Sequence, residues 1–447
     1  MGARAQEQRR DLSTESPRKS PGTAANPSHP SRRDAIMLGA LTFAGLAETA
    51  LAGCGAQATT DSSASSSSDH SQSVPTISEA SQPSANPLLA IPGATQQAAS
   101  QARSLLSTMT LEQKVHQMFF VTPEKLTGVD TVTQAGETTR AALQAHPVGG
   151  IAYFADNLTN PEQTRTLLSG TQAMARELTG IPLLLSVDEE GGTVARIARN
   201  AAFGVENPGD MRDVGSTGDA SYAHDVALTI GTYLRDLGFN LDFAPVCDVA
   251  SNPDSDVMAR RSFGDDPQLV ADMVASQVEG FAQAGMLCSA KHFPGIGAAL
   301  GDSHDVNIVS EKSVEELATE ELIPFERAVS AGVPLVMVGH LSLPVATGSD
   351  EPACLNPHVI TDLLRDRLGF TGLVISDSLE MGAVTQLHDS AEAAVLGIQA
   401  GLDLLLMPED FDAALEGVMA ALADGTITEG RIDESVARIL TLKFSRL

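Results

Sequence analysis

The sequence predicts an α/β fold: a single (β/α)8 barrel of the TIM type over residues 94–447. Eight short apolar runs alternate with stretches of helical pattern, and charged or titratable residues lie at the ends of five of these runs. An open, doubly wound sheet would show the same alternation. No Gly-x-Gly-x-x-Gly motif follows the first run, however, which disfavours the nucleotide-binding form of that sheet.

Two further segments are expected before the barrel. Residues 1–53 have the pattern of a Tat-like lipoprotein signal peptide, in which Arg32-Arg33 precedes an apolar stretch too short to span a membrane comfortably. Leu51-Ala52-Gly53-Cys54 resembles a bacterial lipobox, so we expect lipidation of Cys54 and anchoring to the outer face of the cell membrane. An uncleaved anchor or a chance cysteine is the alternative. Residues 54–93 are rich in Ser and Pro and predict a disordered tether.

Composition excludes some functions. The formal net charge of −29 argues against nucleic acid as a partner, because few cations are present to neutralise phosphates. The four cysteines contain no C-x-x-C pair, so no zinc site is expected. Cys247 and Cys288 lie in apolar runs that predict burial, and a disulfide among these two and Cys354 stays open.

Helix-capping residues and apolar runs predict the elements of the barrel. Capping boxes are expected at Thr110…Gln113 and Ser313…Glu316, and Asn160-Pro161 predicts a capped helix start. The predicted strands are Gln117–Val121, Gly149–Phe154, Leu183–Val187, Asn240–Val246, Leu287–Lys291, Leu335–Val338, Gly372–Ser376 and Leu402–Met407.

Polar residues gather where these strands end. The five strand ends carry Asp188-Glu189-Glu190, then Asp248 with Arg260-Arg261 beyond it, Lys291-His292, His340, and Asp377-Ser378. A single charged residue after a strand is often a helix N-cap, and Asp377 alone could be one. Because all these ends meet at one barrel mouth, we expect a functional site there.

The chemistry of that mouth suggests sugar cleavage. Asp377 would stand at the rim as a nucleophile or charge stabiliser. Asp302 lies two residues before His304, and a carboxylate beside an imidazole favours its protonated, acidic form. Donors and acceptors for several hydroxyl groups would come from Asp188, Arg196, Arg261, Lys291 and His292. Glycoside hydrolysis needs one acid and one nucleophile or base.

Residues 291–304 form a loop rich in Pro and Gly, which a helix or central strand would not tolerate. By itself this segment is compatible with an ordinary polar surface turn. Together with the other strand ends, it divides into Lys291-His292, which would grip the sugar, and Asp302-Ser303-His304, which would carry the acid. We expect Gly295, Gly297 and Gly301 to let the loop move.

These segments resemble the family 3 glycoside hydrolases, and within them the NagZ-like β-N-acetylhexosaminidases, over residues 100–447. The similar segments are Asp188-Glu189-Glu190-Gly191-Gly192 with Arg196, Phe243–Asp248 with Arg261–Gly264, Lys291–Gly295, Asp302-Ser303-His304, and Ser376–Met381. The resemblance implies a covalent glycosyl-enzyme on Asp377, His304 as acid and base, and Asp302 as its orienting partner. It implies sugar contacts from Asp188, Arg196, Arg261, Lys291 and His292, retention of configuration, and no metal or organic cofactor.

The chain departs from the family pattern at Glu189 and Thr193, which replace the usual Gln and Arg, and at Ile296. The family's β-glucosidases carry their acid on a second domain, and no room for one follows the expected last helix, Asp433–Phe444. That absence, with Asp302 and His304 present, favours the hexosaminidase branch. We expect an exo-acting enzyme that releases N-acetylglucosamine from cell-wall fragments or other glycans, and we expect it to be a monomer. The alternatives are a β-glucosidase, an N-acetylglucosaminide phosphorylase, or a non-catalytic sugar-binding lipoprotein.

Overall fold

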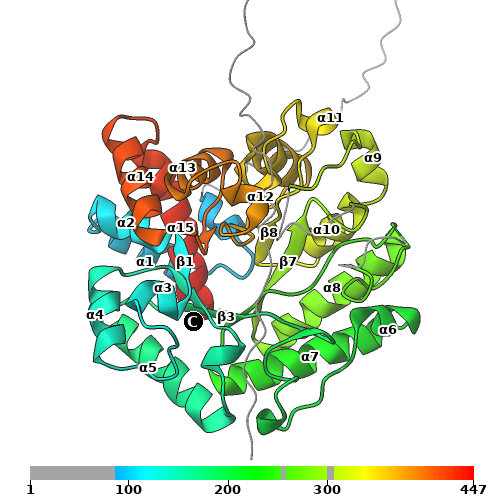
Figure 1. Cartoon of the computed structure of the whole chain (residues 1–447), viewed down its shortest axis with the longest axis horizontal. Helices are drawn as coiled ribbons and strands as arrows, with labels where there is room; N and C mark the ends of the chain where they lie inside the picture. Colours follow the sequence, from blue (N-terminus) through cyan, green and yellow to red (C-terminus); the bar gives the residue numbers. More distant parts are fainter. Residues whose placement is uncertain (1–85, 253–257, 300–306) are drawn as a thin grey trace, which may run out of the picture. The chain divides into compact units, whose positions relative to one another are not determined.

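The computed structural model describes residues 86–252, 258–299 and 307–447. The predicted signal peptide, Cys54 and the tether up to residue 85 lie outside the described residues, as do Asp302 and His304. The described chain is an α/β barrel in which helices surround a central parallel sheet (Figure 1).

Eight parallel strands form the barrel, and each overlaps one of the eight predicted runs. They are β1 (Phe119–Val121), β2 (Gly150–Ala152), β3 (Leu184–Val187), β6 (Leu241–Asp242), β7 (Leu287–Phe293), β8 (Leu335–Val338), β9 (Leu373–Ser376) and β10 (Leu405–Leu406). Their order is β10-β1-β2-β3-β6-β7-β8-β9. A parallel bridge between Ile375 and Leu404 joins the two ends of this sheet, so the predicted TIM-type barrel is confirmed.

Helices alternate with these strands and cover the outside of the barrel. The longer ones are α1 (Gln96–Leu106), α5 (Pro161–Thr179), α7 (Ala220–Leu237), α8 (Pro267–Ala284), α10 (Leu322–Ser330), the π-helical η5 (His358–Arg367), α13 (Ser390–Ala400), α14 (Phe411–Ala423) and α15 (Glu429–Arg446). The predicted capping boxes at Thr110 and Ser313 are present, and Asn160 caps α5 ahead of Pro161. The strands are buried throughout because side chains fill the barrel on one face and helices cover the other.

The barrel domain begins before residue 94. Pro87–Ala90 form the short 3-10 helix η1, which contacts α1 and α15. Leu88 and Ile91 are buried in the same apolar core as the barrel. Residues 86–93, which the sequence assigned to the tether, are therefore part of the folded barrel domain, because these two apolar side chains are buried in its core.

The three cysteines of the barrel, Cys247, Cys288 and Cys354, are free and buried, so none of them forms a disulfide with another. Burial raises the pKa of each thiol above its ordinary value. Among the described residues, no group of His, Cys, Asp and Glu side chains is arranged to hold a metal ion. Within the same ranges, no helix is long and apolar enough to cross a membrane.

Candidate active site

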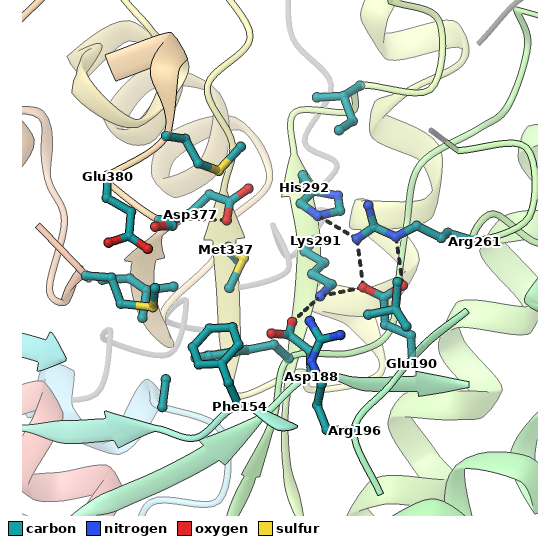
Figure 2. Close-up of a pocket in the computed structure, with 18 residues that line it drawn as sticks. Phe154, Asp188, Glu190, Arg196, Arg261, Lys291, His292, Met337, Asp377 and Glu380 are labelled. Atoms are coloured by element: carbon teal, nitrogen blue, oxygen red, sulfur yellow. Dashed lines mark hydrogen bonds and ion pairs between the residues drawn. The ribbon is translucent and has the colours of Figure 1, made fainter. Parts of the chain in front are cut away.

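A cavity of about 390 Å³ lies at the carboxyl ends of the strands, and Figure 2 shows the side chains that line it. All six predicted site residues that the structure describes line this cavity: Asp188, Arg196, Arg261, Lys291, His292 and Asp377. They come from four separate strand ends, which barrel closure brings together. The other two predicted residues, Asp302 and His304, are outside the described residues.

A small hairpin after β3 supplies the first of these side chains. It consists of β4 (Glu189–Gly191) and β5 (Val194–Ala195), which pair antiparallel. Gly191 and Gly192 form its turn with φ values of 98° and 56°, a backbone region that favours glycine. The hairpin was not predicted, although a Gly-Gly pair after an extended run is a hairpin signal. It turns the chain back so that Arg196 lies beside Asp188 (Figure 2).

Lys291 is the centre of a buried cluster of charges. Its Nζ lies 2.8 Å from Asp188 Oδ1 and 2.6 Å from Glu190 Oε1. Glu190 also accepts two hydrogen bonds from Arg261, at 2.9 Å from Nε and 2.7 Å from Nη2. Burial alone would raise the pKa of Glu190, but the Arg261 and Lys291 charges outweigh it and lower that pKa well below its usual value.

Glu190 was not assigned a site role from the sequence. A usable signal was its spacing from Asp188, because residues two apart in an extended strand face the same side. Its bidentate pairing with Arg261 fixes the direction of that guanidinium. The cluster therefore presents fixed donors and acceptors of hydrogen bonds to the cavity, which suits a ligand with several hydroxyl groups.

Asp248, which does not line the cavity, orients the His292 ring. The Asp248 carboxylate is completely buried, and its Oδ2 lies 2.7 Å from His292 Nδ1. Its Oδ1 accepts the backbone N–H of Ile296 at 2.7 Å. On the other side of the ring, His292 Nε2 lies 3.2 Å from Arg261 Nη2. The ring is thus held between the Asp248 carboxylate, which can only accept, and the Arg261 guanidinium.

Asp377 follows β9 and faces His292 across the cavity (Figure 2). It caps no described helix, because the next one, α12 (Gly382–Thr385), has Met381 at its N-cap. Its Oδ1 accepts the backbone N–H of Ser378 at 2.8 Å. Burial would raise the pKa of Asp377, but the charges of His292 and His340, this hydrogen bond and Lys291 together lower it. The carboxylate is thereby kept ionised.

His340, at the end of β8, supports this carboxylate from outside the cavity lining. Its Nε2 lies 2.8 Å from the Ser378 carbonyl oxygen, and its Nδ1 lies 3.2 Å from the Cys354 sulfur. A carbonyl only accepts, so Nε2 carries the proton and Nδ1 faces the thiol. The sequence indicated His340 as a strand-end residue and gave it no role.

The cavity lining also includes apolar side chains, among them Phe154, Met337, Leu406 and Met407. Glu380 is a further charged residue of the lining, and it lies 3.8 Å from the Lys125 ammonium. Burial raises the pKa of Glu380. No sequence signal separated Glu380 from the other residues that follow Asp377.

Two loop glycines have a reason other than the predicted mobility. Gly295 has φ 120°, and a Cβ there would lie 2.9 Å from Glu321. A Cβ on Gly297 would lie 2.0 Å from the Val249 carbonyl oxygen, so the backbone leaves no room for a side chain. Both positions are thus required by conformation and close packing. Gly301 is outside the described residues.

This fold and cavity define a class: a parallel α/β barrel whose mouth sets an ionised carboxylate opposite a rigid cluster of hydrogen-bonding groups. Residues 110–442 match the Glycosyl hydrolase family 3 N terminal domain, and the chain belongs to this family. The resemblance found in the sequence is confirmed.

Several relatives give the family match more detail. The chain is 32% identical over 326 residues to "Beta-hexosaminidase A" of Pseudoalteromonas piscicida, which covers 67% of this chain and 54% of that protein. It is 35% identical to "Beta-hexosaminidase LpqI" of Mycobacterium tuberculosis, covering 68% of this chain and 78% of the relative. The solved family 3 beta-N-acetylglucosaminidase of Paenibacillus superimposes with a TM-score of 0.71 at 39% identity, covering 76% and 63%. The chain spans little more than half the length of its first curated relatives.

Proposed function

We propose that this protein is a retaining, exo-acting β-N-acetylhexosaminidase that releases terminal β-linked N-acetylglucosamine from cell-wall fragments or other glycans. The observation that carries the proposal is the ionised Asp377 in one cavity with the Lys291, Glu190 and Arg261 cluster. Relatives named beta-hexosaminidase and beta-N-acetylglucosaminidase support the choice of sugar.

In the proposed reaction, Asp377 attacks the anomeric carbon while His304 donates its proton to the departing glycosidic oxygen. The bond from Asp377 to the sugar forms as the glycosidic bond breaks, which leaves a covalent glycosyl-enzyme. His304 then takes a proton from water, whose oxygen attacks the same carbon and releases Asp377. Two inversions give retention of configuration. Asp302 would orient the His304 imidazole and favour its charged form.

The non-reducing sugar would be held by Asp188, Arg196, Arg261, Lys291 and His292. Their mutual pairing supports this role, because groups already fixed by one another need little reorganisation when a ligand binds. The roles of Asp302 and His304 rest on the sequence. The attachment of both flanks of their segment to the barrel supports them: Ile296 lines the cavity, while Ile308 and Ser310 share backbone hydrogen bonds with Ser342.

The direct test is turnover of an aryl β-N-acetylglucosaminide. Wild-type protein should release the aryl alcohol, and Asp377→Ala should lower kcat by at least about 10³-fold with an unchanged melting temperature. Azide should restore part of the Asp377→Ala activity and yield the α-glycosyl azide. A wild type inert on this and other aryl β-glycosides would refute the proposal.

The role of His304 has its own test, a series of aryl leaving groups. His304→Ala should slow substrates with poor leaving groups most, because these need the proton. Equal losses across the series would count against His304 as the acid.

The alternative functions have separate tests. The products formed with and without inorganic phosphate distinguish hydrolysis from phosphorolysis. The relative rates on 2-hydroxy and 2-acetamido substrates distinguish a β-glucosidase from a β-N-acetylhexosaminidase. Binding of N-acetylglucosamine oligomers without cleavage would favour the sugar-binding lipoprotein.

We also propose that the barrel is exported and anchored through a lipid on Cys54. The twin arginine, the short apolar stretch and the lipobox-like Leu51–Cys54 support this proposal. Expressed in a bacterium, the wild type should incorporate labelled fatty acid and enter the detergent phase, whereas Cys54→Ala should do neither. Labelling that persists in Cys54→Ala would contradict the assignment.

A further inference from the structure

We propose that Glu189, which does not line the cavity, is a positioning residue that holds Arg196 in the geometry needed to bind the sugar. The sugar as ligand rests on the function proposed above. The sequence singled out Glu189 only as a departure from the family pattern, where Gln is usual.

The side chains of three successive acidic residues divide between two directions. Asp188 and Glu190 line the cavity, whereas Glu189, the residue between them, is completely buried and does not. Alternation along an extended strand accounts for this, because neighbouring side chains point to opposite faces. The backbone N–H of Glu189 is itself fixed by Asp242 Oδ1 at 3.0 Å. Glu189 is therefore aimed into the body of the protein by a strand anchored to β6.

The Glu189 carboxylate binds the backbone that carries Arg196. Its Oε2 accepts the N–H groups of Arg196 at 2.6 Å and Ile197 at 2.9 Å. Its Oε1 accepts the N–H of Ala198 at 2.8 Å and the hydroxyl of Tyr233 at 2.8 Å. One buried side chain thus closes the segment that follows the β4–β5 hairpin.

The four partners explain why a carboxylate fits here better than an amide. Three backbone N–H groups can only donate, and each carboxylate oxygen accepts two bonds. A Gln side chain has one accepting oxygen, and its NH₂ group would face the donor of Ala198 or those of Arg196 and Ile197. Glu189→Gln keeps the size of the side chain but replaces one of the two accepting oxygens by a donor, so the hydrogen bonds to that oxygen are lost.

Among the described residues, the Arg196 guanidinium is not fully hydrogen-bonded. Its guanidinium lies over the Phe154 ring, 5.7 Å from the ring centre, and lines the cavity. Its Nε is buried and has no hydrogen-bond partner among the described residues. A buried donor without a partner costs free energy, and a ligand oxygen that reached it would remove that cost. Figure 2 shows this guanidinium beside Asp188, so both groups can contact the same sugar.

A double-mutant cycle on the full-length protein tests the inference. With an aryl β-N-acetylglucosaminide, Glu189→Gln should lower kcat/KM about tenfold, mainly through KM, because a small misplacement of Arg196 weakens binding. In the Arg196→Ala background, the same change should cost less than about twofold, since Glu189 then has nothing to position. Equal losses in both backgrounds would overturn the proposal and leave Glu189 a purely structural residue.

Tyr233→Phe is the matched milder variant, because it removes one donor and leaves the three backbone N–H groups in place. It should raise KM by about two- to threefold, and this effect too should vanish with Arg196→Ala. If Glu189→Gln does not fold, the Tyr233 cycle decides the question alone, and additivity there overturns the inference.

The failure of this inference is distinguishable from failure of the proposed function. Stabilisation of the wild type by N-acetylglucosamine, followed as a shift in melting temperature, reports binding without catalysis. Glu189→Gln should reduce that shift in the wild-type background. In the Arg196→Ala background, the same substitution should cause no further reduction. An inert wild type without a shift refutes the proposed function, whereas an active wild type with additive variants refutes the positioning role only.

Discussion

Asp377 gains its ionised state from neighbours that arrive on other strands. His292 from β7 and His340 from β8 bring positive charge toward it, and each imidazole is itself oriented by a buried partner, Asp248 or Cys354. Burial opposes ionisation, so the balance depends on these charges being close and fixed. The charges of neighbouring residues therefore set the pH range in which Asp377 is ionised and can act as the proposed nucleophile.

A pH profile tests this balance. Because the pKa of Asp377 is lowered from its ordinary 3.8, it should remain ionised in mildly acidic solution. His340→Asn removes one of the charges that lower this pKa, so the pKa should rise and the acid limb of kcat/KM should move to higher pH. His388→Asn is the control, because His388 pairs with Glu351 and Glu392 and does not line the cavity. An unmoved limb in His340→Asn would contradict the assigned cause.

At the scale of elements, the segment after β7 is held by close packing. Asp248 binds the N–H of Ile296, and the next residue, Gly297, lies directly against the backbone of Val249. The side chain of Ile296 lines the cavity between these two contacts. The shape of this wall thus depends on backbone approach between the β6 and β7 loops.

Gly297→Ala should therefore disturb the site, although Gly297 does not line the cavity. A Cβ 2.0 Å from the Val249 carbonyl oxygen forces the backbone apart, which should cost about 1–3 kcal/mol of stability and at least about tenfold in kcat/KM. Gly430→Ala is the matched control, since the nearest atom to a Cβ there, Thr428 Oγ1, lies 3.9 Å away and Ala suits a helix, so it should not lower stability. Thermal melts and aryl-substrate kinetics measure both; a fully active Gly297→Ala would argue against tight packing.

At the scale of the whole molecule, Lys443 on α15 is an unusual component of the core. It is completely buried, and its Nζ donates to Gln117 Oε1 at 2.9 Å. Burial lowers the pKa of Lys443 to about 7. Between pH 7 and the ordinary value of 10.5, the unfolded chain holds a proton here that the folded chain lacks, so stability should rise with pH across that window.

Lys443→Met should stabilise the protein at pH 7 by about 1–3 kcal/mol, because the cost of a buried amine exceeds that of leaving Gln117 Oε1 without the Lys443 donor. It should also flatten the rise in stability between pH 7 and 10. Lys114→Met is the matched contrast, since buried Lys114 pairs with Glu429 and Asp433, and its loss should destabilise by about 1 kcal/mol. Urea unfolding at both pH values checks this, and a less stable Lys443→Met at pH 7 would contradict it.

The sequence by itself determined the barrel, its eight strands and six of the side chains that line the cavity. These follow from local signals: apolar runs of strand length, and charged or titratable residues at or after their ends. Only the tertiary structure decided which of those charges pair. Glu190 and Arg261 are 71 residues apart, and Lys291 and Asp188 are 103 apart, so their contact depends on strand order and closure. Asp248, Glu189 and His340 were located at strand ends by the sequence, but their roles as buried partners were not predicted, for the same reason: the role of a buried carboxylate or imidazole depends on what surrounds it in space, and neighbours in sequence do not reveal that.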